Sequence, residues 1–406
     1  MPDFDRRRFL IGSGVIGGLG LLAGGSAITW EQLHSAAQTS PLASGSGVLV
    51  LVTLYGGNDG INTLIPYADK AYHDARPELA YNPSEVLHLD DQLGLNPAMK
   101  GMAAMWKQRS LAVVRGVGYP QPDHSHFRSM DIWQTASPAE PVKTGWVGRW
   151  LDATGDDPLR AVNIGSVLPP LSVGEKATAA ALDVGKQPLP SDLAGALAQL
   201  AATDAADTST ESAVCASYRA ERSVAQTFAP ITGHAPAPAK ATGGKQRQNE
   251  LESQLDLVGR CVKAGVPTRV YSVSLNGFDT HADEKGTQQT VLGTLDSAVS
   301  KFLADMATDR YGRNVVLMAY SEFGRRVAAN ASQGTDHGTA GPVFVAGAPV
   351  RGGFYGDEPS LTNLDNGDLK STTDFRDVYH TLLDKVVGTD PTPAVGAGRS
   401  DLGFVA

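Results

Sequence analysis

Acidic and histidine residues recur in this chain directly or closely after apolar, strand-like runs. The members of this set are Asp59, Asp279, His281, Glu322, Asp336 and His337. In open α/β sheets, ligands bind beyond the carboxyl ends of the strands. Carboxylate oxygens and imidazole nitrogens gathered there suit zinc or manganese, and oxygen ligands alone suit magnesium or calcium. The set therefore predicts a site for one or two divalent metal ions. The alternative is that the aspartates cap helices and the histidines are solvated.

A candidate nucleophile lies in the run Asp123-His124-Ser125-His126. Ser125 is expected at or near the N-cap of a helix that starts at His126. A hydroxyl there faces backbone N–H groups and the positive end of the helix dipole, a setting that also holds phosphate or sulfate. A nearby metal lowers the pKa of such a hydroxyl and activates it. A purely structural N-cap is the alternative, and the flanking histidines could be ligands, proton donors or surface residues.

Two arginines, Arg128 and Arg325, are candidates for pairing with an anionic substrate. A guanidinium matches a phosphate, sulfate or carboxylate with two parallel hydrogen bonds. Arginines in such settings more often form ion pairs at the protein surface, so both interpretations stay open.

Strand and helix patterns alternate along the chain. Strands are expected over 47–54, 111–115, 161–164, 269–274, 314–320 and 342–346. Helices are expected over 96–108, 126–135, 146–153, 247–265, 288–306 and 374–387. This alternation predicts an α/β fold with a mostly parallel sheet and helices on both faces. Residues 175–245 are rich in Ala, Ser, Asp and Thr and predict a helical or loop insertion able to cover a site.

The amino terminus carries the signature of a secretory leader. Arg6 and Arg7 precede Phe9-Leu10 and an uncharged, Gly-rich run, which is typical of a twin-arginine signal peptide. Cleavage after Ala37 would remove residues 1–37, and an uncleaved anchor helix is the alternative. We therefore expect export by the twin-arginine translocase to the periplasm, the cell envelope or the medium. A linker at 31–46 and a single domain over 38–406 would follow.

The net charge, the hydropathy of the later sequence and the two cysteines limit the classes of partner that we expect. The net charge of −9 gives no electrostatic case for binding nucleic acid. No later stretch is apolar enough to span a bilayer, so no stable membrane span is expected after cleavage. An oxidising compartment would allow Cys215 and Cys261 to pair, but the sequence does not decide whether they meet.

Several motifs occur in a characteristic order behind the leader. They are Gly56-Gly57-Asn58-Asp59-Gly60, Ser125-His126-Phe127, Phe278-Asp279-Thr280-His281, Ser321-Glu322-Phe323-Gly324-Arg325 and Thr335-Asp336-His337-Gly338. Together they resemble the exported bacterial family called domain of unknown function 1501, over about residues 48–390. That family is similar to the alkaline phosphatase superfamily, which includes sulfatases and cofactor-independent phosphoglycerate mutases. The resemblance implies an alkaline-phosphatase-like core.

The resemblance also implies roles for individual residues. Asp59 matches the metal-binding aspartate that ends the first strand of the superfamily, and Ser125 matches its nucleophile. Asp279 and His281 match an Asp and a His on one loop that form part of the other metal site. His337 matches a final histidine that precedes a strand.

The chain departs from the superfamily pattern at one strand end. Glu322 and Phe323 stand where the superfamily has an Asp-His pair, so a phenylalanine replaces an expected ligand histidine. A rival correspondence equates Asp336 and His337 with that pair, as in sulfatases. In either case one metal site is weakened or lost. No cysteine stands at the position of Ser125, which argues against a formylglycine mechanism.

The expected function is that of an exported, metal-dependent hydrolase of phosphate or sulfate esters. Ser125 would attack the ester, and His126 or Arg325 would assist. The substrate would be an anionic ester, either a small molecule or a polysaccharide. The alternative is a non-catalytic cell-envelope or polysaccharide-binding protein on a degenerate hydrolase fold.

Overall fold

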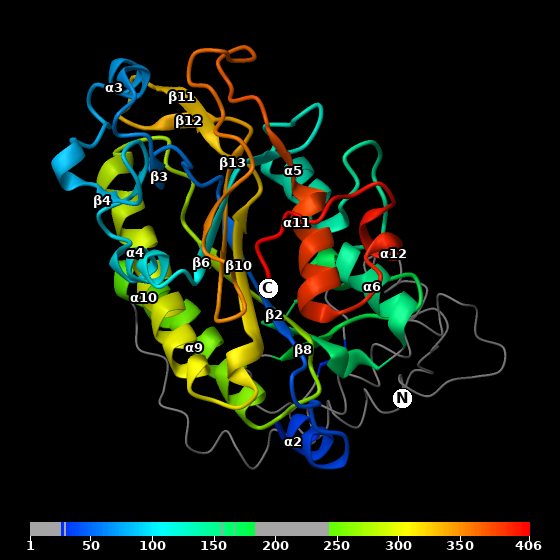
Figure 1. Cartoon of the computed structure of the whole chain (residues 1–406). Helices are drawn as coiled ribbons and strands as arrows, with labels where there is room; N and C mark the ends of the chain where they lie inside the picture. Colours follow the sequence, from blue (N-terminus) through cyan, green and yellow to red (C-terminus); the bar gives the residue numbers. More distant parts are fainter. Residues whose placement is uncertain (1–25, 28–29, 156, 166, 183–242) are drawn as a thin grey trace, which may run out of the picture. The chain divides into compact units, whose positions relative to one another are not determined.

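The computed structural model describes residues 26–27, 30–155, 157–165, 167–182 and 243–406 (Figure 1). The leader arginines Arg6 and Arg7, most of the expected insertion at 175–245, and Cys215 lie outside these residues. The chain divides into two compact units, which are described separately. The single domain expected over 38–406 stays a prediction.

The larger unit comprises residues 43–142, 241–263 and 269–406 and is built on a mixed sheet. Its strands, in spatial order, are β9 (Val270–Asn276), β2 (Val48–Tyr55), β10 (Val315–Ser321), β13 (Gly341–Ala346), β6 (Leu111–Gly118) and β14 (Gly353–Tyr355), with β15 (Thr373–Asp374) also on β6. All neighbours are parallel except at β13, which runs antiparallel to both β10 and β6. The expected mostly parallel sheet is confirmed.

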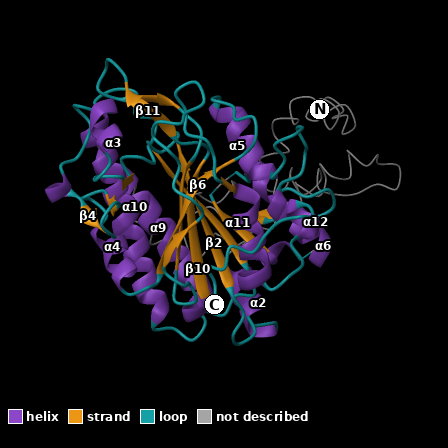
Figure 2. Cartoon of the chain, turned by 45° about the horizontal axis from the view of Figure 1, so that its top comes forward, coloured by secondary structure: helices purple, strands orange, loops and turns teal. Residues whose placement is uncertain are grey.

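The central strands are buried because both faces of the sheet are covered. β2 is a continuous apolar run whose first seven residues are buried, which is typical of a parallel strand between two helical layers. Figure 2 shows α4, α9 and α10 on one side of the strands and α5 and α11 on the other. These helices are α4 (Lys100–Lys107), α5 (His126–Thr135), α9 (Gly243–Lys263), α10 (Glu284–Ala307) and α11 (Phe375–Thr381). The expectation of helices on both faces is therefore confirmed.

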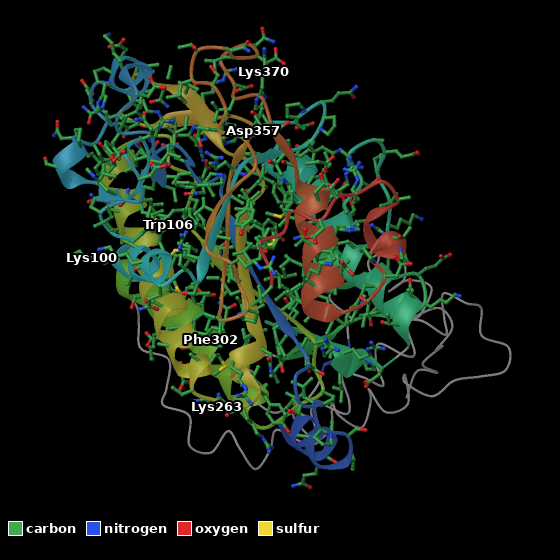
Figure 3. All side chains as sticks on the ribbon, viewed as in Figure 1. Lys100, Trp106, Lys263, Phe302, Asp357 and Lys370 are labelled. Carbon is green, nitrogen blue, oxygen red and sulfur yellow. The ribbon has the colours of Figure 1, made fainter. Side chains whose placement is uncertain are left out.

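Each helical layer is fixed by large apolar side chains. On the first side α4 and α10 carry Trp106 and Phe302, which Figure 3 labels. On the second side the ring of Trp133 in α5 stacks on Tyr320 of β10, with centroids 5.2 Å apart, and packs edge-on against Tyr379 of α11. α11 continues into a π-helix, η6 (Leu382–Val387), and α12 (Thr392–Val395) follows.

Short elements surround the carboxyl end of the sheet. They are β3 (Leu64–Ile65), α3 (Lys70–Ala75), η1 (Pro83–Glu85), β4 (Leu87–His88), β5 (Gly94–Leu95), β11 (Arg325–Ala329) and β12 (Thr335–His337). At the opposite end, η5 (Gly312–Asn314) directly precedes β10. β11 and β12 form an antiparallel hairpin in which Arg325 lies opposite His337. Asp336 and His337 both lie within β12.

The smaller unit comprises residues 1–42, 143–240 and 264–268. Its described elements are β1 (Ser26–Ala27), α2 (Trp30–Thr39), α6 (Trp146–Thr154), η2 (Pro158–Arg160), β7 (Ala161–Ile164), η3 (Pro170–Ser172) and β8 (Ala180–Leu182). β8 pairs in parallel with both β1 and β7. The expected linker at 31–46 is wrong in its first part, because residues 31–39 belong to α2 and Leu33 is fully buried.

Two further expectations concern a membrane span and the pairing of the two cysteines. Among the described residues, no helix combines the length and the apolar character needed to cross a bilayer. Cys261 is buried within α9, and burial raises the pKa of its thiol to about 12. Its pairing with Cys215 stays a prediction.

Candidate functional site

Two glycines let the loops at the carboxyl end of the sheet approach one another. Gly56 and Gly57 follow β2 directly and have φ values of +120° and +68°. A Cβ atom on Gly56 would lie 2.4 Å from the backbone nitrogen of Asp279, and one on Gly57 would lie 2.1 Å from the ring of Phe323. Only glycine tolerates both the backbone conformation and the contact. The β2 loop can therefore pack directly on the loops that follow β9 and β10.

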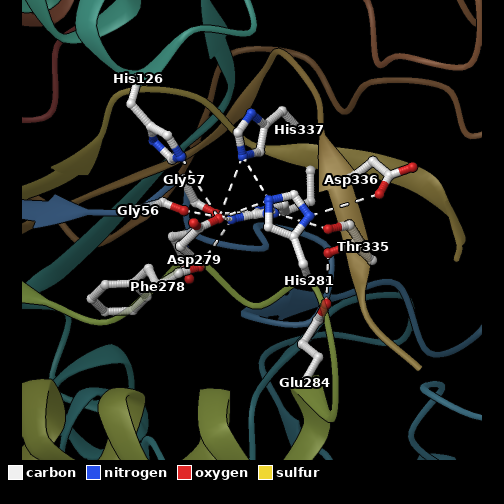
Figure 4. Close-up of polar contacts among 12 residues, drawn as sticks. Gly56, Gly57, His126, Phe278, Asp279, His281, Glu284, Thr335, Asp336 and His337 are labelled. Carbon is white, nitrogen blue, oxygen red and sulfur yellow. Dashed lines mark hydrogen bonds and ion pairs between the residues drawn. The ribbon is translucent and has the colours of Figure 1, made fainter. Parts of the chain in front are cut away.

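One carboxylate oxygen is the centre of the resulting cluster. Oδ1 of Asp279 lies 3.0 Å from Nε2 of His281, 3.4 Å from Nε2 of His337 and 3.7 Å from Nε2 of His126 (Figure 4). Nη2 of Arg325 donates a hydrogen bond of 2.7 Å to the same oxygen. The Nε2 atoms of His281 and His337 are themselves 2.9 Å apart. Three imidazoles, from the start of α5, the loop after β9 and the end of β12, thus converge on one carboxylate.

Two of the three imidazoles are oriented through their other nitrogen. Nδ1 of His126 lies 2.8 Å from Oε1 of Glu322, and Nδ1 of His337 lies 2.8 Å from the carbonyl oxygen of His124. Both acceptors require a proton on Nδ1, so each neutral ring presents the lone pair of Nε2 to Asp279. Partners of this kind fix the tautomer and the direction of histidines that bind metals.

Neighbouring groups shift the pKa values of the cluster residues in different directions. The hydrogen bond to Glu322 raises the pKa of His126. Burial lowers the pKa of His337, and the charges of Arg325 and His126 lower it further. Partial burial acts to raise the pKa of Asp279, but the hydrogen bond and the charge of Arg325 outweigh it and hold this pKa below its usual value. The centre therefore combines an ionised carboxylate with a neutral imidazole at His337.

These donor atoms fit a divalent metal ion. A tetrahedral zinc ion with bonds of about 2.0–2.1 Å holds its ligand atoms about 3.3 Å apart. The contacts of Asp279 with the three histidines bracket this spacing, and the ligand atoms of His126, Asp279 and His337 all lie within 4.8 Å of one another. A mixed set of imidazole and carboxylate also favours zinc or manganese over calcium. Among the described residues, this group is the one whose side chains could hold a metal ion.

The other expected ligands make different contacts. Glu322 is buried, and its Oε1 accepts from the backbone N–H of Gly56 at 2.9 Å as well as contacting His126. It therefore orients a histidine and a loop rather than facing the centre. Asp336 is exposed, and its Oδ1 lies 3.8 Å from Nδ1 of His281.

Asp59 does not join the histidine cluster because Arg76 binds it. Both side chains are fully buried, and both carboxylate oxygens of Asp59 accept hydrogen bonds from the guanidinium. Burial acts to raise the pKa of Asp59, but the charge of Arg76 outweighs it and holds this pKa low. Glu284 is the third buried residue beside the ion pair of Asp59 and Arg76. Burial and the charge of Asp59 raise its pKa to about 9, so it is a protonated acid that hydrogen-bonds Asp59.

Arg325 is also buried, and all three of its guanidinium nitrogens are engaged. Besides Asp279, it donates to the carbonyl oxygens of Gly57 at 2.6 Å, Gly56 at 2.5 Å and Thr335 at 2.9 Å. In this structure it joins loops instead of facing a substrate. Arg128 lies elsewhere in α5 and pairs with Asp131 at 2.5 Å.

Ser125 is the N-cap of α5, as expected, and it is exposed. Its side chain makes no capping hydrogen bond, so the hydroxyl is not committed to the helix end. Its neighbours on both sides contact the cluster, His124 through its carbonyl oxygen and His126 through its ring. Ser125 therefore lies on the segment that holds two of the three converging histidines.

Phe323 lies where a ligand histidine was expected. Its ring packs against those of His126 and His337, with centroids 4.9 and 4.8 Å away. It gives the cluster an apolar wall and supplies no metal ligand. Phe323 cannot bind a metal, and Asp59 is already bound by Arg76. The remaining side chains therefore provide donors for one metal ion, and two of the donors expected for a second metal ion are missing.

Sequence reasoning missed several residues of this region. Arg76, Glu284 and the carbonyl of His124 were not singled out; Arg76 is the residue that ends α3, and Glu284 is the first residue of α10. The sequence carries no signal that an arginine at the end of α3 reaches a carboxylate after β2. Only the run His124-Ser125-His126, already noted for its side chains, pointed toward the carbonyl contact.

Comparisons with known proteins show the family but not the activity. No curated protein matches the chain significantly. Solved structures that resemble it include a protein in the alkaline phosphatase superfamily from Vibrio parahaemolyticus, with 9% identity, a TM-score of 0.41, and 95% of this chain and 81% of that one covered. A phosphonate monoester hydrolase from Silicibacter pomeroyi has 13% identity, a TM-score of 0.34, and coverage of 87% and 75%. The alkaline phosphatase from the Antarctic bacterium TAB5 has 10% identity, a TM-score of 0.34, and coverage of 75% and 92%.

Similarities at this level carry no argument about activity, which has to rest on the site. The sequence comparison is more specific, because one family model covers most of the chain, including every residue of the cluster. On that match, over residues 47–398, the chain belongs to the family described as protein of unknown function, DUF1501.

Proposed function

We propose that this protein is a metal-dependent hydrolase of phosphate or sulfate esters with Ser125 as its nucleophile. The observation that carries the proposal is the convergence of His126, His281 and His337 on Oδ1 of Asp279, with two rings oriented through Nδ1. Partners that point Nε2 toward a carboxylate prepare a metal site. His126, Asp279 and His337 would hold the ion, and His281 would complete the set.

The residues around the centre suit attack on an anionic ester. A bound divalent cation would neutralise charge on the ester oxygens and lower the pKa of the attacking hydroxyl. The hydroxyl of Ser125 would lose its proton and form a bond to phosphorus or sulfur while the bond to the ester oxygen breaks, and the departing alkoxide would take up a proton to leave as the alcohol. Water would then hydrolyse the seryl ester, releasing phosphate or sulfate and restoring the Ser125 hydroxyl. The backbone N–H groups of the first turn of α5 favour the negative charge of the transferred group. The ring of Phe323, which packs on His126 and His337, would exclude water from one side of the metal site.

Export by the twin-arginine translocase remains part of this proposal. The leader that motivates it lies outside the described residues. Replacing Arg6 and Arg7 with lysine should leave the protein in the cytoplasm, and normal export of that variant would refute the assignment.

The metal and the nucleophile are tested with one set of variants. Metal content after purification without chelator should be stoichiometric in the wild type and lost in Asp279→Ala and His337→Ala. The loss of metal affinity should exceed the roughly 10- to 100-fold that is typical when a residue that only hydrogen-bonds a metal ligand is replaced. His88→Ala is the matched control, because His88 is exposed and contacts a backbone carbonyl away from the cluster.

The nucleophile variant separates binding from chemistry. Ser125→Ala should keep the metal and abolish turnover of p-nitrophenyl phosphate or p-nitrophenyl sulfate, because it removes the hydroxyl and leaves the ligands in place. A wild type that holds no metal, and cleaves neither ester when zinc, manganese, magnesium or calcium is supplied, would refute the proposal.

A second function has observations in its favour. Asp59 is bound by Arg76, and Phe323 takes the place of a ligand, so two donors of a second metal are missing. A non-catalytic binding protein of the cell envelope would retain the fold under these changes. Stoichiometric metal in a protein without turnover on any phosphate or sulfate ester would favour this alternative.

A further inference from the structure

One buried carboxylate, that of Asp368, joins two segments of the candidate active site. The residue is 5% exposed. Its Oδ2 lies 2.8 Å from Nε2 of His124, and its Oδ1 lies 3.5 Å from Nε of Arg326. Because a carboxylate accepts hydrogen bonds, Nε2 of His124 is the donor. Hydrogen bonds to a charged acceptor are roughly twice as strong as those between neutral groups.

Asp368 is presented from a tight turn in the loop between β14 and β15. Asn366 and Gly367 have φ values of +49° and +94°, as in a type I′ turn. The backbone N–H groups of Asp365 and Asp368 each donate to the carbonyl oxygen of the other at 2.9 Å and close the turn. Figure 3 labels Lys370, two residues beyond Asp368. The position of the carboxylate is therefore set by its own loop.

His124 connects this carboxylate to the histidine cluster. Its carbonyl oxygen accepts from Nδ1 of His337 at 2.8 Å, and Ser125 follows it in the chain. The backbone N–H of Ser125 donates to Oδ1 of Asp123 at 2.7 Å, so this turn leads directly into α5. The side chain of His124 is 43% exposed, and packing holds such a ring less than a hydrogen bond does. The bond to Asp368 therefore sets the position of His124.

The other oxygen of Asp368 faces the strand that holds the central carboxylate of the cluster. Arg326 lies in β11 directly after Arg325, whose Nη2 donates to Oδ1 of Asp279 at 2.7 Å. Asp368 thus joins the segment of the proposed nucleophile to the strand of Arg325. It acts on the cluster through these two neighbours.

We propose that Asp368 is a positioning residue of the active site. Through the ring of His124 it fixes the carbonyl that orients His337 and the turn that carries Ser125. The effect on turnover rests on the proposed function, whereas the effect on the orientation of His337 does not.

The tautomer of His337 measures this role directly. In metal-free protein labelled with nitrogen-15 histidine, long-range proton–nitrogen NMR at pH 8 should show the proton of His337 on Nδ1. Asp368→Ala should move part of this population to Nε2, because the carbonyl of His124 is no longer held in place. Asp365→Asn is the matched control, since Asp365 is an exposed aspartate of the same turn that lies outside this hydrogen bond.

Two variants of His124 separate the hydrogen bond from the bulk of the ring. His124→Gln keeps an N–H donor and should retain most of the Nδ1 tautomer of His337. His124→Leu removes the donor at an exposed position and should behave as Asp368→Ala does, which keeps the test valid if Asp368→Ala does not fold.

Zinc affinity gives a second measurement without turnover. Competition with a chromophoric chelator should show a loss of about tenfold in Asp368→Ala and in His124→Leu, near the lower end of what is typical when a group that orients a metal ligand is replaced. The double variant should lose no more than either single variant, because both break the same bond. Losses that multiply, or an unchanged tautomer and zinc affinity in both single variants, would overturn the proposal.

Kinetics test the effect on the nucleophile. The kcat for p-nitrophenyl phosphate should fall about tenfold or more in Asp368→Ala, because Ser125 is displaced from its position of attack. An unchanged kcat beside a redistributed His337 proton would contradict the positioning of Ser125. If the wild type hydrolyses no ester or binds no zinc, the proposed hydrolase function fails, and the tautomer of His337 still decides whether Asp368 positions it.

Discussion

Glu284→Gln should stabilise the protein, although it alters a buried residue beside an ion pair. The carboxyl of Glu284 is buried and hydrogen-bonds Asp59, and the hydroxyl of Thr335 donates to it at 2.6 Å. With Glu284 protonated, the positive charge of Arg76 balances the negative charge of Asp59. Glutamine is the neutral isostere, and its amide N–H can replace the acid proton as donor to Asp59.

The magnitude follows from the protonation of Glu284. Its pKa is about 9 in the folded protein, against an ordinary value of 4.5 for a glutamate in the unfolded chain. Between these values the folded state binds a proton that the unfolded state has released, so stability falls as the pH rises. Each pH unit costs about 1.4 kcal/mol, and the penalty at pH 7 is therefore on the order of 3 kcal/mol. Glutamine does not titrate and avoids this penalty.

Urea unfolding followed by tryptophan fluorescence at several pH values measures this effect. The advantage of Glu284→Gln should be near zero at pH 4.5, grow with pH, and level off above pH 9. Glu78→Gln, at an exposed position, should change stability little at any pH. A variant that is less stable than the wild type at pH 7, or an advantage that does not depend on pH, would refute the reasoning.

Three further predictions concern the loops of the site. Gly57→Ala should lower the stability by about 1–3 kcal/mol in thermal unfolding, because φ is +68° and the new Cβ would meet the ring of Phe323; an unchanged Tm would contradict the close approach. Glu322→Gln should lower the pKa of His126 in an NMR titration of metal-free protein, because the charged acceptor at Nδ1 is lost. Arg325→Lys should cost about 3–5 kcal/mol in urea unfolding, since one ammonium cannot replace the bonds of a buried guanidinium, and a cost below about 1 kcal/mol would disprove that role.

The strands and the main helices could be predicted from hydrophobic patterning. The apolar run of β2 is bounded by glycines, and the long helix α10 repeats apolar residues at helical spacing, so both were expected close to their observed bounds. The antiparallel direction of β13 was not expected, because a buried strand has the same apolar pattern in either direction. The first turn of α10 was missed because Glu284 reads as a solvated charge.

The site could be predicted only in part, because its residues come from distant segments. Their positions at strand ends and their family motifs brought Asp279, His281 and His337 into one hypothesis. The partners that decide their surroundings could not be found in this way. Arg76 contacts Asp59 across 17 positions, and Glu322 contacts His126 across 196. Such pairings depend on loop geometry, which the spacing of residues along the sequence does not specify.

The contacts of Arg325 also bear on how the site opens. One guanidinium bonds backbone carbonyls of the β2 loop, the β9 loop and β12, together with the carboxylate of Asp279. Opening any of these segments breaks bonds to the same side chain and weakens its hold on the others. Their amide protons should therefore exchange with solvent as one cooperative unit, and not loop by loop. Local unfolding would then remove the site as a whole, and a ligand on one loop would protect all three.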